Sequence, residues 1–479
     1  MVGGVLLGGQ EPKPATTSFQ KNGNLLGLIS HAQKIGLILL PSFISQGRIP
    51  NDSTQARLST SPTLYLDGLR GLFSFLVFLR HFLLPWEEGL DTGYGQSNTP
   101  NNTSLIKFPI IRLLYAGPTV PIFFIVSGFV LAYKPLKLIR KKHYDSLGLH
   151  IMSSVLRRPF RLFLPPLVST FIVALAVNAG LYMAPYQDMP GWVPRHPKPL
   201  GSLWKQLWDW TRFVVVDLTH PWSWKSPASE YDSHLWTIPI QFRASMIVYL
   251  ALLSLARAQT WVRGTALVVL GLYSLQQGRW EMYLFFAGVF LAERSLKSQT
   301  LEAQLNDGGE TAQFRYSTPY SVWTTLSQRV LFVFGLYLSS YPRARNAGSS
   351  TPGYVLLSTA TDQYIYWQSY GATLICWSLS RDRLLQKPFT SRPLRYLANI
   401  SFTLYLVHGP VLHLFGYSMV PAFQDFTGRS TWWQYQLGVL LALVALVPMV
   451  VWIADVFWRV VDKPCSTFVV HTIEPFFVN

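Results

Sequence analysis

The chain has 479 residues, of which 49% are hydrophobic and only 13% are charged, whereas soluble domains carry about 25% charged residues. Several apolar stretches approach about 20 residues, the length that crosses a bilayer as a helix, so the composition argues against a string of soluble domains and predicts a multi-pass membrane protein. The formal net charge of +17 is explained by Lys and Arg in cytoplasmic loops. No aromatic and basic platform accompanies it, so nucleic acid is not expected as a partner.

The first 60 residues are expected to form a cytoplasmic N-terminal segment. Residues 1–23 are mostly polar or Gly and carry only a short apolar patch, so no cleavable signal peptide is evident. Residues 24–47 are more apolar and are suited to lie along the membrane surface. Lys34 and Pro41 argue against a full span there.

The rest of the chain is predicted to be all-α, a polytopic membrane helix bundle of about ten transmembrane helices over residues 61–464, with a cytoplasmic tail over 465–479. The predicted spans are 64–85, 113–133, 162–183, 234–256, 262–277, 280–296, 329–341, 365–380, 396–416 and 433–457. The loops after the second and eighth spans are rich in Lys and Arg, and Arg263 opens the fifth span. These charges share one side if both termini are cytoplasmic.

Two loops are expected on the opposite side of the membrane. The loop 86–109 holds overlapping Asn-x-Ser/Thr sequons at Asn101 and Asn102, which are candidate glycosylation sites in a lumenal loop. The loop 184–233 is long and rich in Trp. It is interpreted either as an interfacial belt or as a lid over a substrate cavity, because loops of this length are usually functional or disordered.

The first span carries ionisable groups on one helical stripe. Arg70 and His81 are eleven residues apart, close to three whole turns, so they share a face and lie about 16 Å apart along the axis. Asp67 falls near the same stripe. Ionisable groups in a membrane helix usually face a protein interior or a wet cavity and carry function. The alternative is an Asp67–Arg70 pair at the helix start with an interfacial His81.

A cluster of arginines precedes the third span. Arg157, Arg158 and Arg161 lie at a cytoplasmic helix start, where guanidinium groups are suited to hold phosphates bidentately. The alternative is ordinary anchoring of a cytoplasmic loop.

Polar residues recur at helical spacing in later spans. His234 and Gln241 are expected to share one face of the fourth span, Glu281 opens the sixth, and the ninth carries Tyr405 and His408. Such stripes are often only hydrogen bonds between helices, but three histidine-bearing stripes in one bundle favour a shared polar interior. The two cysteines do not suggest a metal site, and the sequence contains no H-E-x-x-H pattern, so no metal is expected.

Five segments carry a recognisable pattern: Tyr65–Gly71 with His81, Val120–Phe129, Arg158–Arg161, Leu235–Pro239 and Ile400–His408. Together they resemble the acyltransferase 3 family of integral-membrane acyltransferases. The fourth segment is most similar to the filamentous-fungal branch. Two positions depart from the family pattern, in which Glu is frequent: Gln241 and Asp462.

The resemblance implies transfer of an acyl group, most often acetyl, from acyl-CoA to a hydroxyl of a small-molecule acceptor such as a fungal secondary metabolite. It implies an endoplasmic reticulum protein surrounded by membrane lipid. Under this hypothesis His81 is the general base, Arg158 and Arg161 hold the CoA phosphates, and Arg70 either holds CoA or pairs with Asp67. The residues expected to contact substrate are His234, Gln241, Glu281, Tyr405 and His408. Direct transfer and an acyl-histidine relay both remain open.

Two other classes of protein fit parts of the same pattern. Ten spans with intramembrane His and Arg suit a secondary transporter, although the sequence shows no internal repeat of the kind that many transporters have. A catalytically inactive relative that binds or senses a small molecule is the other alternative, because Gln241 replaces a frequent carboxylate.

Overall fold

The computed structural model describes residues 40–42, 63–97, 99, 102–223, 230–307, 322–473 and 475. The chain divides into two units, Met1–Asn51 and Asp52–Asn479. In the first unit only residues 40–42 are described, so the predicted surface segment 24–47 lies almost entirely outside the described residues. Asn101 lies outside them as well.

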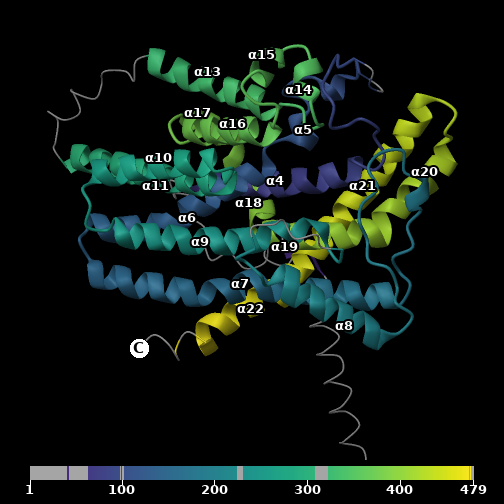
Figure 1. The fold of residues 1–479 in the computed structure, drawn as a ribbon, viewed down its shortest axis with the longest axis horizontal. Coiled ribbons are helices and arrows are strands. Elements are labelled where there is room, and N and C mark those ends of the chain that lie inside the picture. The colour runs from purple at the N-terminus through teal and green to yellow at the C-terminus, as the bar shows by residue number, and fades with distance from the viewer. Residues whose placement is uncertain are drawn as a thin grey trace, which may run out of the picture. The chain divides into compact units, whose positions relative to one another are not determined.

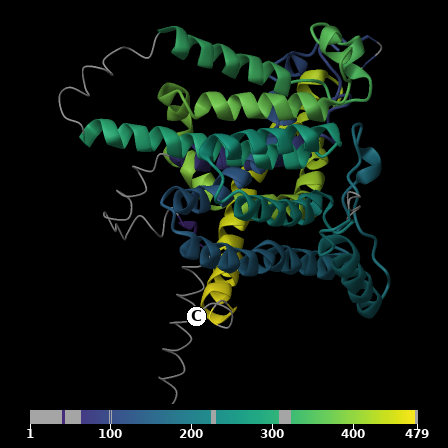
Figure 2. The ribbon, with the colours of Figure 1, turned by 60° about the vertical axis from the view of Figure 1, so that its left-hand side comes forward.

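Within its described residues, the second unit is helical and contains no strand, which confirms the all-α prediction. Its longer helices are α4 (Leu64–Leu83), α6 (Thr119–Arg140), α7 (Tyr144–Asn178), α9 (Thr237–Ser254), α10 (Thr260–Gln276), α11 (Trp280–Asp307), α13 (Val322–Ser339), α16 (Tyr364–Leu379), α19 (Ser401–Val411), α20 (Tyr417–Thr427) and α21 (Trp432–Phe457). Helices α6, α7, α9, α10, α11 and α16 run roughly side by side, and α21 crosses them at a steep angle (Figures 1 and 2).

Shorter helical segments connect or extend the long ones. The short α-helices are α5 (Leu113–Ala116), α8 (Leu203–Phe213), α14 (Ala347–Ser350), α15 (Val355–Ser358), α17 (Arg383–Gln386), α18 (Arg392–Asn399) and α22 (Lys463–Phe468). The 3-10 and π segments are η2 (Leu105–Lys107), η3 (Tyr186–Asp188), η4 (Val214–Leu218), η5 (Ser233–Trp236), η6 (Lys387–Thr390), η7 (Leu412–Gly416), η8 (Trp458–Asp462) and η9 (Val469–Ile473).

Each of the ten predicted spans contains a helix, but fewer helices have the length and hydropathy of a membrane crossing. Among the described residues, four helical runs do, and a fifth is a pair bent by 73° at residue 400. The first predicted span falls short because α4 carries Asp67, Arg70 and Arg80 within 20 residues. Helices α10 and α16 have only 17 and 16 residues. The number of crossings therefore stays a prediction.

The stretch predicted as a basic loop after the second span is mostly helical. Helix α6 continues to Arg140 and α7 already begins at Tyr144, so only residues 141–143 connect them. The arginines that precede the predicted third span therefore lie inside a 35-residue helix. A helix holds their side chains at fixed positions along one rod, as a mobile loop would not.

Two glycines bring α4 close to the segment before α19. A Cβ atom at Gly71 would lie 2.5 Å from the carbonyl oxygen of Leu394 on α18, and one at Gly68 would collide with the backbone of Phe389. Small residues of this kind allow close backbone approach between membrane helices. The glycines on either side of Arg70 thus explain how its side chain reaches the α18–α19 junction.

Helix α4 lies between two hydrophobic clusters. Leu69 and Phe73 belong to a cluster shared with α6, α9 and α11, whereas Phe78 and Phe82 belong to one shared with α7, α19 and α21. Because apolar side chains on both sides fix the rotation of α4, its polar residues are held in defined directions.

Candidate active site

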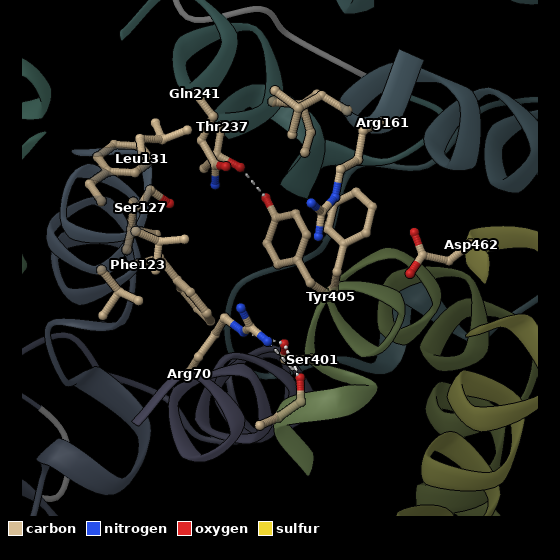
Figure 3. Close-up of a pocket in the computed structure, with 18 of the residues that line it drawn as sticks. Arg70, Phe123, Ser127, Leu131, Arg161, Thr237, Gln241, Ser401, Tyr405 and Asp462 are labelled. Carbon is tan, nitrogen blue, oxygen red and sulfur yellow. Dashed lines mark hydrogen bonds between the residues drawn. The ribbon is translucent and has the colours of Figure 1, made fainter. Parts of the chain in front are cut away.

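A cavity of about 270 Å³ opens between α4, α6, α7, α9 and α19. Five of the residues predicted to bind substrate or CoA line it: Arg70, Arg158, Arg161, Gln241 and Tyr405. Figure 3 shows Arg70 and Arg161 entering it from opposite sides. Asp462 is the one carboxylate among the lining residues. With three guanidinium groups and one carboxylate, the cavity wall carries a net positive charge and favours an anion.

Arg70 is held mainly by the α18–α19 junction. Its Nε donates to the hydroxyl of Ser401 at 2.9 Å, and its Nη2 donates to the carbonyl oxygen of Ala398 at 3.1 Å. The carboxylate of Asp67 lies 3.7 Å from Nη2, and its side chain is 51% exposed. Since Asp67 does not line the cavity, the structure gives it no position from which to act on a ligand there.

The two arginines of α7 are placed differently. Nε of Arg158 donates to the hydroxyl of Ser245 on α9 at 3.0 Å, and that hydroxyl donates to the backbone carbonyl of Gln241 at 2.5 Å. Arg161 extends from α7 into the cavity near Tyr405 (Figure 3). One guanidinium is therefore fixed in the wall while the other reaches into the space.

Tyr405 connects this cavity to a deeper group of residues. Its hydroxyl lies 2.7 Å from Oγ1 of Thr237, and it also contacts the backbone carbonyl of His234. The ring of Tyr405 lines the cavity, whereas His234 lies behind it. The side chain of Tyr405 therefore links the cavity wall to the backbone of His234.

Three histidines from separate helical segments meet behind the cavity. The ring centroids of His81 and His234 are 4.0 Å apart, those of His234 and His408 are 4.4 Å apart, and those of His81 and His408 are 5.5 Å apart. His234 and His408 are buried, while His81 is partly exposed. We call His81, His234 and His408 the histidine cluster. It gathers residues that the sequence placed on three separate stripes.

A carboxylate that the sequence reasoning missed supports this cluster. Asp232 caps η5, and its Oδ1 lies 2.7 Å from Nδ1 of His234 and accepts the backbone N–H of the same residue at 2.9 Å. A carboxylate on Nδ1 fixes the tautomer of an imidazole and stabilises its protonated form. The available signal was an Asp two residues before a His at a predicted helix start, where Asp is a preferred cap.

The structure matches the predictions for the later spans only in part. His234 does not continue the face of Gln241, because the 3-10 turn η5 precedes α9 and interrupts the helical spacing. Glu281 does not reach the cavity. Its carboxylate is buried and lies 3.3 Å from Nη2 of Arg243, so it forms an internal ion pair, and its contact with substrate stays a prediction. His81 and His408 do not line the cavity either, but join the histidine cluster.

A second cavity of about 570 Å³ lies among α6, η5, α11, α16 and the segment 343–346. Val120 lines both cavities. The second is also lined by Trp236, Trp280 and Arg343. Trp236 is two residues from His234, so this cavity begins within one helical turn of the histidine cluster.

The long loop 184–233 lies against the His81 end of α4. The backbone N–H groups of Gly191 and Trp192 donate to the carbonyls of Pro85 and Leu84. The same loop stacks Tyr186 on His196 and leaves several Trp side chains more than half exposed, among them Trp204 and Trp208. It therefore has features of both expected roles, a cover near the cluster and exposed aromatic rings suited to the membrane interface.

Comparison with known proteins identifies relatives of this arrangement. A family model described as an acyltransferase domain matches residues 63–459. The chain is 29% identical to the O-acetyltransferase PaAT-1 of Phomopsis amygdali over 447 residues, covering 89% of this chain and 86% of the relative. It is 26% identical to the acyltransferase clz18 of Cochliobolus lunatus, covering 84% and 94% of the two chains, and 26% identical to the acyltransferase R4 of a Phoma species, covering 85% and 94%. No solved structure matches the chain.

Proposed function

Since the chain belongs to the acyltransferase 3 family of integral-membrane acyltransferases, we propose that it transfers an acyl group, most often acetyl, from acyl-CoA to a hydroxyl of a small molecule. The observation that carries this proposal is the pairing of a basic cavity with the histidine cluster, joined through Tyr405. One part is suited to a phosphorylated donor and the other to moving a proton. We further propose that the acceptor is a natural product.

The donor is assigned to the first cavity. CoA carries phosphates at its nucleotide end, and Arg158 and Arg161 supply guanidinium groups of the kind that bind phosphate bidentately. Arg70 adds a third positive charge at the opposite wall. The apolar part of the wall, which includes Phe123 and Leu131, suits the pantetheine arm. In this arrangement the pantetheine arm extends past Tyr405 and carries the thioester toward the histidine cluster.

The acceptor is assigned to the second cavity. Its wall shares Val120 with the first and includes Trp236 and Trp280, whose rings suit the carbon skeleton of a small natural product. Two cavities with a common wall allow donor and acceptor to approach one centre from different sides. That centre is the histidine cluster, because His234 lies close to both.

His81 is proposed as the general base, since it is the partly exposed member of the cluster. The acceptor oxygen attacks the thioester carbonyl while its proton passes to an imidazole nitrogen of His81. The carbon–sulfur bond then breaks, the ester forms, and the CoA sulfur takes up the proton. His234, fixed by Asp232, lies against His81 and is placed to stabilise the positive charge that His81 gains. The hydroxyl of Tyr405 donates to the backbone carbonyl of His234 in this structure, and after turning away from that carbonyl it is a candidate donor to the developing oxyanion.

Both termini are proposed to lie in the cytoplasm, with the protein in the endoplasmic reticulum. This topology follows from the basic loops, and it places Arg158 on the cytoplasmic side, where acyl-CoA is available, and Asn102 in the lumen. Glycosylation of Asn102 together with protease access to a C-terminal tag from the cytoplasm tests the topology. A tag that is protected from protease would reverse it.

The assay for the proposed reaction is release of free CoA by tag-free protein purified in detergent. Acetyl-CoA is supplied with an extract of candidate alcohols, and the product is sought as a metabolite heavier by one acetyl unit. A strain that lacks the protein should lose the same metabolite. A transporter would instead accumulate solute in vesicles without consuming acetyl-CoA, and a sensor would do neither.

A further inference from the structure

The nitrogen atoms of the histidine cluster form a group that none of the expected roles explains in full. One ring nitrogen from each of His81, His234 and His408 lies within 4.8 Å of the other two. The three histidines come from α4, η5 and α19, so no short spacing in the sequence predicts that they meet. This distance is within the range from which three imidazoles converge on one ion after small side-chain movements.

The hydrogen bonds of two of these rings determine which nitrogen faces inward. Nδ1 of His408 donates to the carbonyl of Tyr405 at 2.8 Å, so its Nε2 carries a lone pair. That Nε2 is fully buried and has no hydrogen-bond partner among the described residues. Nδ1 of His234 donates to Asp232 in the same way, which leaves Nε2 of His234 with a lone pair as well.

The cluster therefore has more lone pairs than protons. His81 can offer one N–H to one neighbour, and the remaining buried nitrogen then has nothing to accept. An unsatisfied buried acceptor is costly. A second proton would place a full positive charge among three packed rings, whereas a bound cation with three nitrogen ligands satisfies all the lone pairs at once.

The surroundings match those of protein metal sites. Metal-bound histidines almost always donate their other ring N–H to a carboxylate or a backbone carbonyl, and here Asp232 and the carbonyl of Tyr405 take those two places. Three imidazoles with one further open position are a frequent set for zinc. The open position lies at His81, since that ring is the partly exposed one.

We infer that the histidine cluster binds one divalent cation of the zinc class, through His81, His234 and His408, and that the bound cation inhibits acyl transfer. The binding itself is independent of the proposed function. The inhibition rests on it, because a cation on His81 occupies the lone pair that would take the proton of the acceptor. Acyltransferase activity would then depend on the level of free zinc.

The test uses full-length, tag-free protein in detergent, stripped with a chelator and titrated with Zn²⁺ or Co²⁺. We expect one zinc per chain by elemental analysis, and visible absorption bands of four-coordinate cobalt. His408→Gln, which keeps the volume of the side chain, should lose both signals. Asp232→Asn should weaken binding about 10- to 100-fold, as for other carboxylate partners of metal-bound histidines.

His413→Gln is the matched control, because His413 is a buried histidine five residues from His408 that hydrogen-bonds to Tyr186 instead of joining the cluster. Its zinc content should equal that of the parent chain. Absence of stoichiometric zinc, or binding that survives His408→Gln, would overturn the metal site. Zinc bound without loss of CoA release would overturn the inhibition, whereas a chain that binds zinc but never releases CoA would overturn only the proposed function.

Discussion

The carboxylate of Asp232 lies 2.7 Å from Nδ1 of His234, and the same oxygen accepts the backbone N–H of that histidine. Both partners are buried. The carboxylate therefore fixes the ring orientation and the tautomer of His234 with one atom. The ring of His234 in turn lies 4.0 Å from that of His81, measured between centroids. The carboxylate of Asp232 is thus separated from His81, the proposed base, only by the ring of His234.

Asp232→Asn should lower turnover about 100-fold with little change in the amount of folded protein. The amide oxygen still caps η5, but the negative charge that favours the protonated histidine pair is lost, and catalysis by such groups is worth about 10²–10⁴-fold. The measurement is the rate of CoA release with saturating donor. Asp188→Asn, at an exposed position of the same loop, serves as the control. Equal rates for the two variants would remove Asp232 from the mechanism.

His81→Ala should reduce acyl transfer at least 100-fold, because the proposed general base is lost. The protein should still insert and fold, because the ring is partly exposed and its loss leaves only a small void. Single-turnover measurement with labelled acetyl-CoA separates this loss from an effect on donor binding. His220→Ala, an exposed histidine of the long loop, should keep full activity. Near-normal turnover of His81→Ala would show that another group takes the proton.

The sequence predicted the helices well because apolar periodicity is a local property. The 11-residue spacing of Arg70 and His81 also predicted a shared face, and both side chains do face α19, where Arg70 contacts Ser401 and His81 lies against His408. Helical geometry alone decides this relationship. The spacing of two residues within one helix predicts it, without knowledge of which helices are neighbours.

Relationships between helices were not predictable in the same way. The three histidine-bearing stripes indicated a shared polar interior, but the contact of His81 with His234 depends on how α4 packs against η5, which a single sequence does not show. Asp232 was missed because it lies before the helix, outside any periodic stripe. Glu281 was assigned to substrate because it is an acidic group at the start of the sixth predicted span. Its ion pair with Arg243, 38 residues away, is visible only in the packing of the helices.

Replacing both cavity arginines, Arg158→Ala with Arg161→Ala, should raise the KM for acyl-CoA at least tenfold with a smaller effect on kcat. In the proposed function the guanidinium groups bind the phosphates in the ground state and in the transition state alike, so their loss is expected to weaken binding uniformly. The measurement is CoA release across a range of donor concentrations. Arg157→Ala is the matched control, since Arg157 lies on the same helix outside the cavity. An unchanged KM in the double variant would indicate that these arginines only anchor a cytoplasmic segment and do not bind the donor.

The basic residues used to orient the chain in the membrane also include a structural pair. Arg140 and Arg263 lie on α6 and α10, and both contact the carboxylate of Glu293 on α11, at 2.6 Å and 3.1 Å. Glu293 and Arg263 are almost fully buried. Breaking a buried ion pair leaves an uncompensated charge, so these two arginines are held in place by the fold as well as by the positive-inside tendency.

Glu293→Gln should therefore destabilise the protein by about 3 kcal/mol, seen as a lower thermal unfolding midpoint in detergent. Asp425→Asn is the control, because its partner Arg429 and Asp425 itself are 48% and 73% exposed, and exposed pairs contribute at most about 1 kcal/mol. The double variant Glu293→Gln with Arg263→Met should recover part of the loss, since it removes the buried charge that the single variant leaves unpaired. A single variant as stable as the control would mean that water reaches these arginines and that α6, α10 and α11 are held together by apolar packing alone.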